Sequence, residues 1–217
     1  MNNGTQEFIE VLKRRPDIVG IILFGSWARG NNRLDSDVDL VVIVTEGFRR
    51  TVEFNNTQAF EIIYTTEKQA FEFWENHKDD SASLWEVAKV VYDKDGTIER
   101  LQKKVEEMLK AGKKPYDQWQ LGQVRFDAED TLRYVEHELS NDPVTANLLL
   151  YIKVFALTEV FFDLRGQWIP APKQRISKIK HASKEFYALL EQFYKDDVAI
   201  VEKLHIARKM IPIVFHM

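Results

Sequence analysis

The chain has 217 residues and a net charge of −4 from 30 basic and 34 acidic side chains, which is too acidic for a protein that holds nucleic acid by general electrostatics. It contains no cysteine, so disulfides, thiolate metal sites and cysteine nucleophiles are excluded. No unbroken apolar run approaches about eighteen residues and the first residues lack a signal-peptide pattern, so we expect a cytoplasmic protein without a membrane span.

Helical and strand patterns alternate in the first half of the chain, which predicts a domain that contains both helices and a sheet. The expected helices are at residues 5–15, 67–77 and 97–111, with a short one after Gly25. The expected strands are at residues 18–24, 38–44 and 88–92, with a hairpin at 49–64 that turns near Asn55 and Asn56.

After Pro115 the sequence has no convincing strand pattern. It predicts four long helices joined by short links, which is typical of a helical bundle. These helices are expected at residues 116–140, 143–165, 173–195 and 197–210. A boundary near 112–115 would therefore separate an α/β domain of residues 1–112 from a helical domain of residues 113–217.

The segment between the first two strands carries the strongest functional signal. One apolar run ends at Gly25-Ser26, and Asp37 and Asp39 lead into the next. Residues two apart on a strand face the same side, so these carboxylates would repel each other unless a cation lies between them. Mg²⁺ prefers such oxygen ligands, and backbone N–H groups at a glycine turn before a helix suit phosphate. The pattern predicts chemistry on a nucleoside triphosphate.

Gly25-Ser26, followed after ten residues by Asp37-Val38-Asp39, resembles the signature of the polymerase-β-type nucleotidyltransferases. Arg29-Gly30 and the sequence around the aspartates resemble the bacterial branch that includes the aminoglycoside and lincosamide antibiotic nucleotidyltransferases. The resemblance implies an α+β fold: a mixed-sheet catalytic domain, residues 1–112, followed by an all-α helical bundle domain that binds the acceptor, residues 113–217. Taken singly, the glycine could be a turn and the serine a helix cap, but the order and spacing favour the functional interpretation.

The resemblance also implies a set of metal ligands. Asp37 and Asp39 would hold two Mg²⁺ ions that assist transfer of NMP from an NTP, with ATP expected, and release of pyrophosphate. A third carboxylate is expected on a neighbouring strand. Glu61 is favoured because its neighbours Phe60 and Ile62 would face the core. Glu53, on the other strand of the hairpin, is the alternative, because sequence does not fix hairpin register.

Other residues are candidates for contacts to the triphosphate. Gly25 and Ser26 should approach it closely. Arg29 would either reach a phosphate or pair with Asp35. The basic segment 170–184 resembles a segment of related helical domains in which a lysine holds the triphosphate, and this suggests Lys173. A solvated basic helix face is the alternative reading.

The helix expected from residue 116 carries Asp127, Glu129 and Asp130, one of which could act as general base. Nothing in the spacing selects one of them, and the pattern favours a solvated helix face. The favoured function is transfer of AMP to a hydroxyl of a small molecule, such as an antibiotic. A protein or RNA acceptor, as in toxin–antitoxin nucleotidyltransferases, is the first alternative, and a non-catalytic nucleotide-binding module is the second. Homodimers are common among the relatives, so a homodimer is also compatible with the resemblance.

Overall fold

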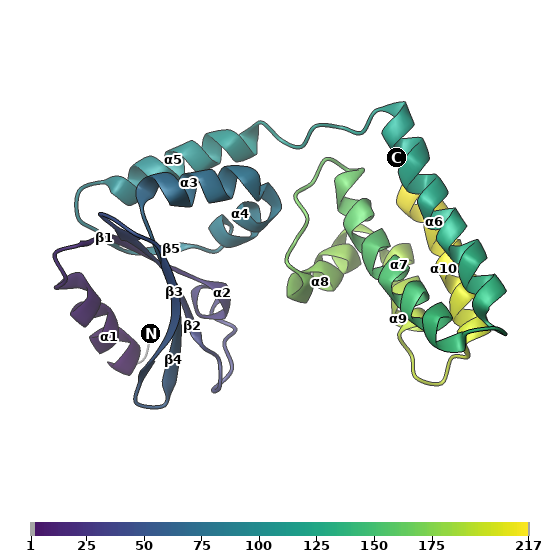
Figure 1. Cartoon of the computed structure of the whole chain (residues 1–217), viewed down its shortest axis with the longest axis horizontal. Coiled ribbons are helices and arrows are strands. Elements are labelled where there is room, and N and C mark those ends of the chain that lie inside the picture. The colour runs from purple at the N-terminus through teal and green to yellow at the C-terminus, as the bar shows by residue number, and fades with distance from the viewer. Residues whose placement is uncertain (1–2, 217) are drawn as a thin grey trace. The chain divides into compact units, whose positions relative to one another are not determined.

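The computed structural model describes residues 3–216, and the chain divides into two compact units, Met1–Ala111 and Gly112–Met217 (Figure 1). The first unit contains, in chain order, α1 (Asn3–Lys13), β1 (Ile18–Phe24), α2 (Gly25–Arg29), β2 (Val38–Val44), β3 (Arg49–Asn55), β4 (Gln58–Thr65), α3 (Glu67–Asn76), α4 (Lys78–Trp85), β5 (Lys89–Asp93) and α5 (Thr97–Lys110). The second contains α6 (Gln118–Glu138), α7 (Pro143–Asp163), α8 (Pro172–Ala182), α9 (Lys184–Phe193) and α10 (Ile200–Phe215). This confirms the predicted α+β class.

The described strands of the first unit form one mixed sheet in the order β3-β4-β2-β1-β5. Strands β2 and β4 are parallel, and the other neighbours are antiparallel. The hairpin of β3 and β4 turns at Asn56-Thr57, where Asn56 has a φ of 54°. Asparagine tolerates this left-handed conformation better than most residues, so the sequence suits a tight turn here.

The two faces of the sheet bury different side chains. Ile9 and Leu12 of α1, with Ala28 of α2, cover one face and pack against the side chains of Leu40 and Ile62. Helices α3 and α5 cover part of the other face, and their buried side chains include Ala70, Trp74, Ile98, Leu101 and Val105. Strand alternation therefore decides which side chains reach the core and which remain near the surface.

Helix α4 was not predicted, because its sequence is polar and has little apolar periodicity. Tertiary contacts hold it instead. The Ser81 hydroxyl donates to the Trp74 carbonyl at 2.8 Å and to the His77 carbonyl at 2.9 Å. Trp85 at its end packs edge-on against Trp74 at 5.1 Å between ring centroids. A polar helix can form when tertiary contacts anchor it in this way.

The second unit is helical, as predicted, but the predicted helix 173–195 is wrong. Two helices, α8 and α9, occupy this range and separate at Ser183, which has extended backbone angles. The Ser183 hydroxyl accepts a hydrogen bond from the Phe186 N–H at 3.2 Å, so it caps α9. The residues described in this unit therefore form five helices rather than four. The last helix also continues to Phe215, past Pro212 and beyond the predicted end at residue 210.

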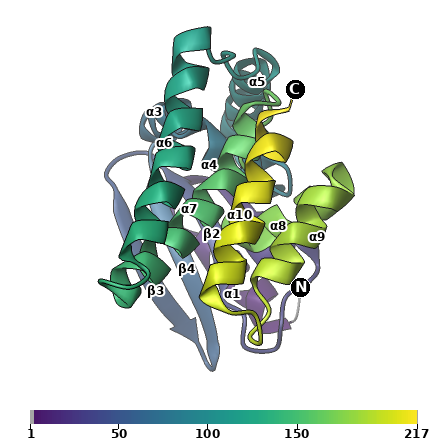
Figure 2. The same cartoon turned by 90° about the vertical axis from the view of Figure 1, so that its right-hand side faces the viewer.

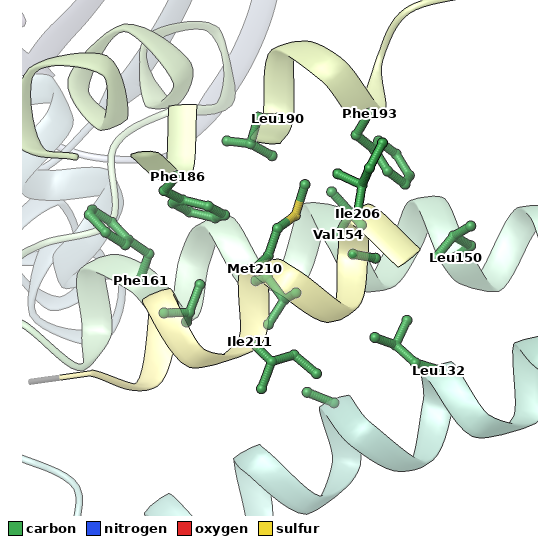
Figure 3. Close-up of a cluster of buried hydrophobic side chains, with 14 of the residues drawn as sticks. Leu132, Leu150, Val154, Phe161, Phe186, Leu190, Phe193, Ile206, Met210 and Ile211 are labelled. Atoms are coloured by element: carbon green, nitrogen blue, oxygen red, sulfur yellow. The ribbon is translucent and has the colours of Figure 1, made fainter. Parts of the chain in front are cut away.

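One hydrophobic core joins the helices of the second unit. Helices α6, α7 and α10 pack against one another (Figures 1 and 2), and α9 packs against α10. Figure 3 shows Phe161 of α7, Phe186 of α9 and Met210 of α10 within this core. All three side chains are fully buried.

By length and composition, α7 is long and apolar enough to cross a membrane, although the sequence contains no unbroken apolar run of that length. The run is interrupted at Lys153 and Glu159. A core helix passes the same test, and α7 contributes seven buried residues to the unit: Ala146, Leu150, Val154, Leu157, Thr158, Phe161 and Phe162. Only 33% of its most apolar window is buried, and Val144 and Leu148 are exposed, so burial in this unit accounts for only part of the composition of α7.

Candidate metal and nucleotide site

The parallel pairing of β2 with β4 brings the predicted acidic residues together. In the register, Asp39 lies beside Glu61, and Asp37 directly precedes β2. A carboxylate oxygen from each of Asp37, Asp39 and Glu61 lies within 4.8 Å of the other two. Three carboxylates at this spacing repel one another, and their oxygens are the donors that a hard divalent cation prefers. The donor set therefore fits Mg²⁺.

Strand alternation explains why these carboxylates avoid the core. Phe60 and Ile62, on either side of Glu61, are fully buried against the α1 and α2 face, so Glu61 points to the opposite face. Asp39 shares that face with Val41, which packs under α3 and α5. The carboxylates thus lie on the α3 and α5 face of the sheet.

Gly25 closes this site from the end of β1. Its φ is 66°, and a β-carbon placed there would lie 1.8 Å from Oδ2 of Asp39. The backbone of Gly25 therefore approaches the carboxylate more closely than any other residue type would allow. Ser26 follows in the first turn of α2, where backbone N–H groups lack helical partners and can bind phosphate oxygens.

An arginine that the sequence analysis did not identify contacts this site. Arg50 of β3 forms an ion pair with Glu61, and its Nε donates to Oε1 of Glu61 at 2.8 Å. The hairpin register explains the contact, because Val52 lies opposite Glu61 and Arg50 lies diagonally across from it. The turn at Asn56-Thr57 was the one signal that could have found this pair.

The structure places Glu53 away from the acidic group. It lies opposite Phe60 in the hairpin, on the other face of the sheet from Glu61. Its carboxylate accepts hydrogen bonds from Arg49 at 2.8 Å and from the Tyr64 hydroxyl at 3.2 Å. Burial and then the negative charge of Glu53 raise the pKa of Tyr64. Glu53 therefore belongs to a separate surface cluster.

In the loop before β2, Arg29 does not form the predicted alternative ion pair with Asp35. Asp35 pairs with Arg33 at 3.0 Å, not with Arg29. Arg29 is exposed and makes no ion pair within residues 3–216. Trp27 packs partly buried against the sheet and donates to the Ser36 carbonyl at 3.3 Å, so it supports the loop.

The candidates in the second unit lie on exposed helix surfaces. Lys173 is exposed in the first turn of α8. Asp127 pairs with Lys153 of α7, whereas Glu129 pairs with Arg125 and Asp130 pairs with Arg133, both at 2.9 Å. Each of the three acids thus already has a basic partner, and the geometry selects none of them as a general base.

Comparison with known proteins identifies the first part of the chain. Residues 5–129 match the family described as the nucleotidyltransferase domain. The chain belongs to this nucleotidyltransferase domain family. The match contains all of the carboxylates and the Gly25 turn, and it extends past Ala111 into α6.

Two individual proteins are similar to this nucleotidyltransferase. A Methanocaldococcus jannaschii protein, provisionally named a protein adenylyltransferase, is 42% identical over 55 residues, which cover 24% of this chain and 37% of that protein. The similarity thus spans little more than a third of the relative. The crystal structure of a nucleotidyltransferase-like protein from Exiguobacterium sibiricum superposes with a TM-score of 0.52 at 13% identity, covering 98% of this chain and 73% of the other. At this identity the likeness shows the fold alone.

Proposed function

We propose that the protein transfers NMP, and specifically AMP from ATP, to a hydroxyl acceptor and releases pyrophosphate. The observation that carries this proposal is the group of Asp37, Asp39 and Glu61, whose ligand atoms lie within 4.8 Å of one another inside a nucleotidyltransferase domain. A Gly25 turn directly against Asp39 supports it.

In the proposed reaction the acceptor oxygen attacks the α-phosphorus of the nucleotide. A new P–O bond forms to the acceptor, the bond to the β-phosphate oxygen breaks, pyrophosphate leaves, and the hydroxyl proton passes to solvent or a base. Two Mg²⁺ ions, when bound, would stabilise charge on the attacking and leaving oxygens. The three carboxylates would hold these ions, and their rigid placement on neighbouring strands would position the reacting groups.

The triphosphate would lie against the start of α2. Gly25 and Ser26 would offer backbone N–H groups, and the exposed Arg29 would contribute a positive charge to a phosphate. Lys173 is proposed as a further contact from the helical unit. In this proposal residues 1–112 carry the chemistry and residues 113–217 contribute to acceptor binding.

A protein hydroxyl is the acceptor class we favour. The Methanocaldococcus relative carries the name of a protein adenylyltransferase. In addition, Val52 and Phe54 lie on the same face of β3 as Arg50, next to Glu61, and expose 55% and 70% of their surface. Exposed apolar side chains beside a reactive site suit a protein partner. The net charge of −4 disfavours RNA.

A small-molecule hydroxyl, such as that of an aminoglycoside or lincosamide antibiotic, is the second candidate. It is supported by the sequence resemblance to the antibiotic nucleotidyltransferases, which also combine a catalytic domain with a helical domain. Both candidates suit the cytoplasm, where ATP and Mg²⁺ are available.

Pyrophosphate release with Mg²⁺ and each of the four NTPs tests the reaction, with the Asp37→Asn/Asp39→Asn double variant as the blank. The acceptors would be a cell lysate, a desalted protein fraction of that lysate, and a panel of aminoglycosides and lincosamides. Labelling of a protein band from α-labelled ATP would support a protein acceptor, whereas drug-dependent release would support the antibiotic alternative. Equal signals from wild type and the double variant with every acceptor would contradict the proposed function.

A further inference from the structure

The Arg50 guanidinium is bound to the acidic group itself. Its Nε and Nη2 both donate to a single oxygen of Glu61, Oε1. The Glu61 side chain is 27% exposed and that of Arg50 is 66% exposed, so the pair lies at the edge of the site. One of the three candidate metal ligands is thus occupied by a cation that belongs to the protein.

We propose that Arg50 is the counterion of Glu61 in the metal-free protein and competes with the divalent cation for this carboxylate. The inference rests on the proposed function, because it takes Asp37, Asp39 and Glu61 as the metal ligands. It assigns to Arg50 the role of a positioning residue that sets how tightly free metal binds.

The competition follows from the charges. Without metal, three carboxylates lie within 4.8 Å of one another, and the guanidinium reduces their mutual repulsion. A divalent cation must then bind beside the positively charged guanidinium of Arg50, and it must share or replace the contact of this group to Oε1 of Glu61. Both effects weaken binding of the free cation. A bound nucleoside triphosphate brings compensating negative charge. Arg50 should therefore weaken metal binding less when the metal binds together with the nucleotide.

The neighbouring arginine provides a matched control. Arg49 lies one position earlier on β3, is 60% exposed, and forms an ion pair with Glu53 at 2.8 Å. Strand alternation directs it to the opposite face from Arg50, toward the ring of Tyr64. Replacing Arg49 therefore removes the same charge from the same strand without touching the acidic group.

The experiment is a Mn²⁺ titration followed by electron paramagnetic resonance of the free ion, with no nucleotide present. Wild type would be compared with Arg50→Gln, Arg49→Gln and Asp37→Asn, and circular dichroism and thermal melting would confirm that each variant is folded. We expect Arg50→Gln to bind Mn²⁺ about three- to tenfold more tightly than wild type. Arg49→Gln should stay within about twofold. Adding a non-hydrolysable ATP analogue should shrink the difference between Arg50→Gln and wild type.

The outcomes separate this inference from the proposed function. If Asp37→Asn binds Mn²⁺ as wild type does, the metal site is wrong and the proposed function loses its support. If Asp37→Asn loses binding while folded Arg50→Gln binds Mn²⁺ equally or more weakly, the metal site stands and the competition is refuted. An equal gain in Arg49→Gln would also refute it, because the effect would then reflect net charge alone.

Discussion

Gly25 and Asp39 approach so closely that a β-carbon on Gly25 would lie 1.8 Å from Oδ2 of Asp39 and 2.7 Å from its Cγ. The glycine therefore has two separate requirements, a positive φ of 66° and an absent side chain. The absence of a side chain is a requirement of the candidate site itself, because a β-carbon on Gly25 would collide with Asp39, a proposed metal ligand.

Gly25→Ala should therefore displace the Asp39 carboxylate. We expect nucleotidyl transfer to fall by about 10² or more, because a misplaced ligand disturbs the reacting geometry. Gly30→Ala is the control, since Gly30 has a φ of 77° but no atom within 4 Å of an added β-carbon. It should cost stability of about 1 kcal/mol through strain and retain most of its activity. Equal activity losses in the two variants would show that backbone strain, not Asp39, is responsible.

The two glutamates of the hairpin should differ in their effect on activity. Glu61→Gln removes a charge next to Asp39, and we expect transfer to fall by about 10² or more. Glu53→Gln changes a residue on the opposite face that binds Arg49 and Tyr64, and activity should change by less than about threefold. Pyrophosphate release at saturating Mg²⁺ and ATP measures both. A larger loss of activity in Glu53→Gln than in Glu61→Gln would show that Glu61 is not the third ligand.

Helix α3 begins with a capping box that should contribute measurably to stability. The Thr66 hydroxyl accepts from the Gln69 N–H at 3.3 Å, and the Gln69 side chain accepts from the Thr66 N–H at 3.3 Å. Thr66→Ala should lower the free energy of unfolding by about 1 kcal/mol, whereas Thr66→Ser should preserve it. Urea denaturation followed by tryptophan fluorescence measures the difference. Equal stability of the alanine and serine variants would mean that the cap contributes nothing.

Acidification should destabilise the start of α7. Hydrogen bonds from Thr145 to the Asp142 side chain lower the pKa of this carboxyl from 3.8. Because the folded-state pKa is the lower one, the unfolded chain takes up its proton first, and the stabilisation is lost as pH falls below about 4. Asp142→Asn removes the titrating group. The stability gap between wild type and this variant should therefore shrink from pH 6 to pH 3, and a constant gap would contradict the assignment.

Short apolar runs made much of the first unit predictable. The runs at 18–24 and 38–44 are strands β1 and β2 with the predicted bounds, because both are short, rich in β-branched residues and bounded by polar or glycine residues. The break at Ser183 could not be found in this way, because the helical pattern continues on both sides of it. Only the capping hydroxyl distinguishes Ser183 from a helical serine. Helix α4 likewise depends on a side-chain contact, from Ser81 to the Trp74 carbonyl, that apolar periodicity does not reveal.

The sequence predicts which residues of the candidate site share a face of one strand, but not how the two strands of the hairpin align. The spacing of Asp37 and Asp39 gives their common face directly. The apolar neighbours of Glu61 favoured it over Glu53, but excluding Glu53 and finding Arg50 required knowing that the turn contains two residues, since a shift of one position reverses every face. Sequence also gave no means to decide whether Arg29 or Arg33 pairs with Asp35, because both arginines are within reach in the chain.

The parallel pair of β2 and β4 is connected through β3 alone, so the proposed metal ligands and the Gly25 turn all come from one continuous stretch, residues 25–61. Such short separations keep the entropy cost of closing the loops low, and local folding of this stretch brings the carboxylates together. Under the proposed division of roles, in which residues 113–217 contribute to acceptor binding, changes in the helical unit would alter the acceptor without disturbing the carboxylate geometry. In evolutionary terms, that proposal would leave a lineage free to exchange acceptors while inheriting one unchanged segment of proposed metal ligands.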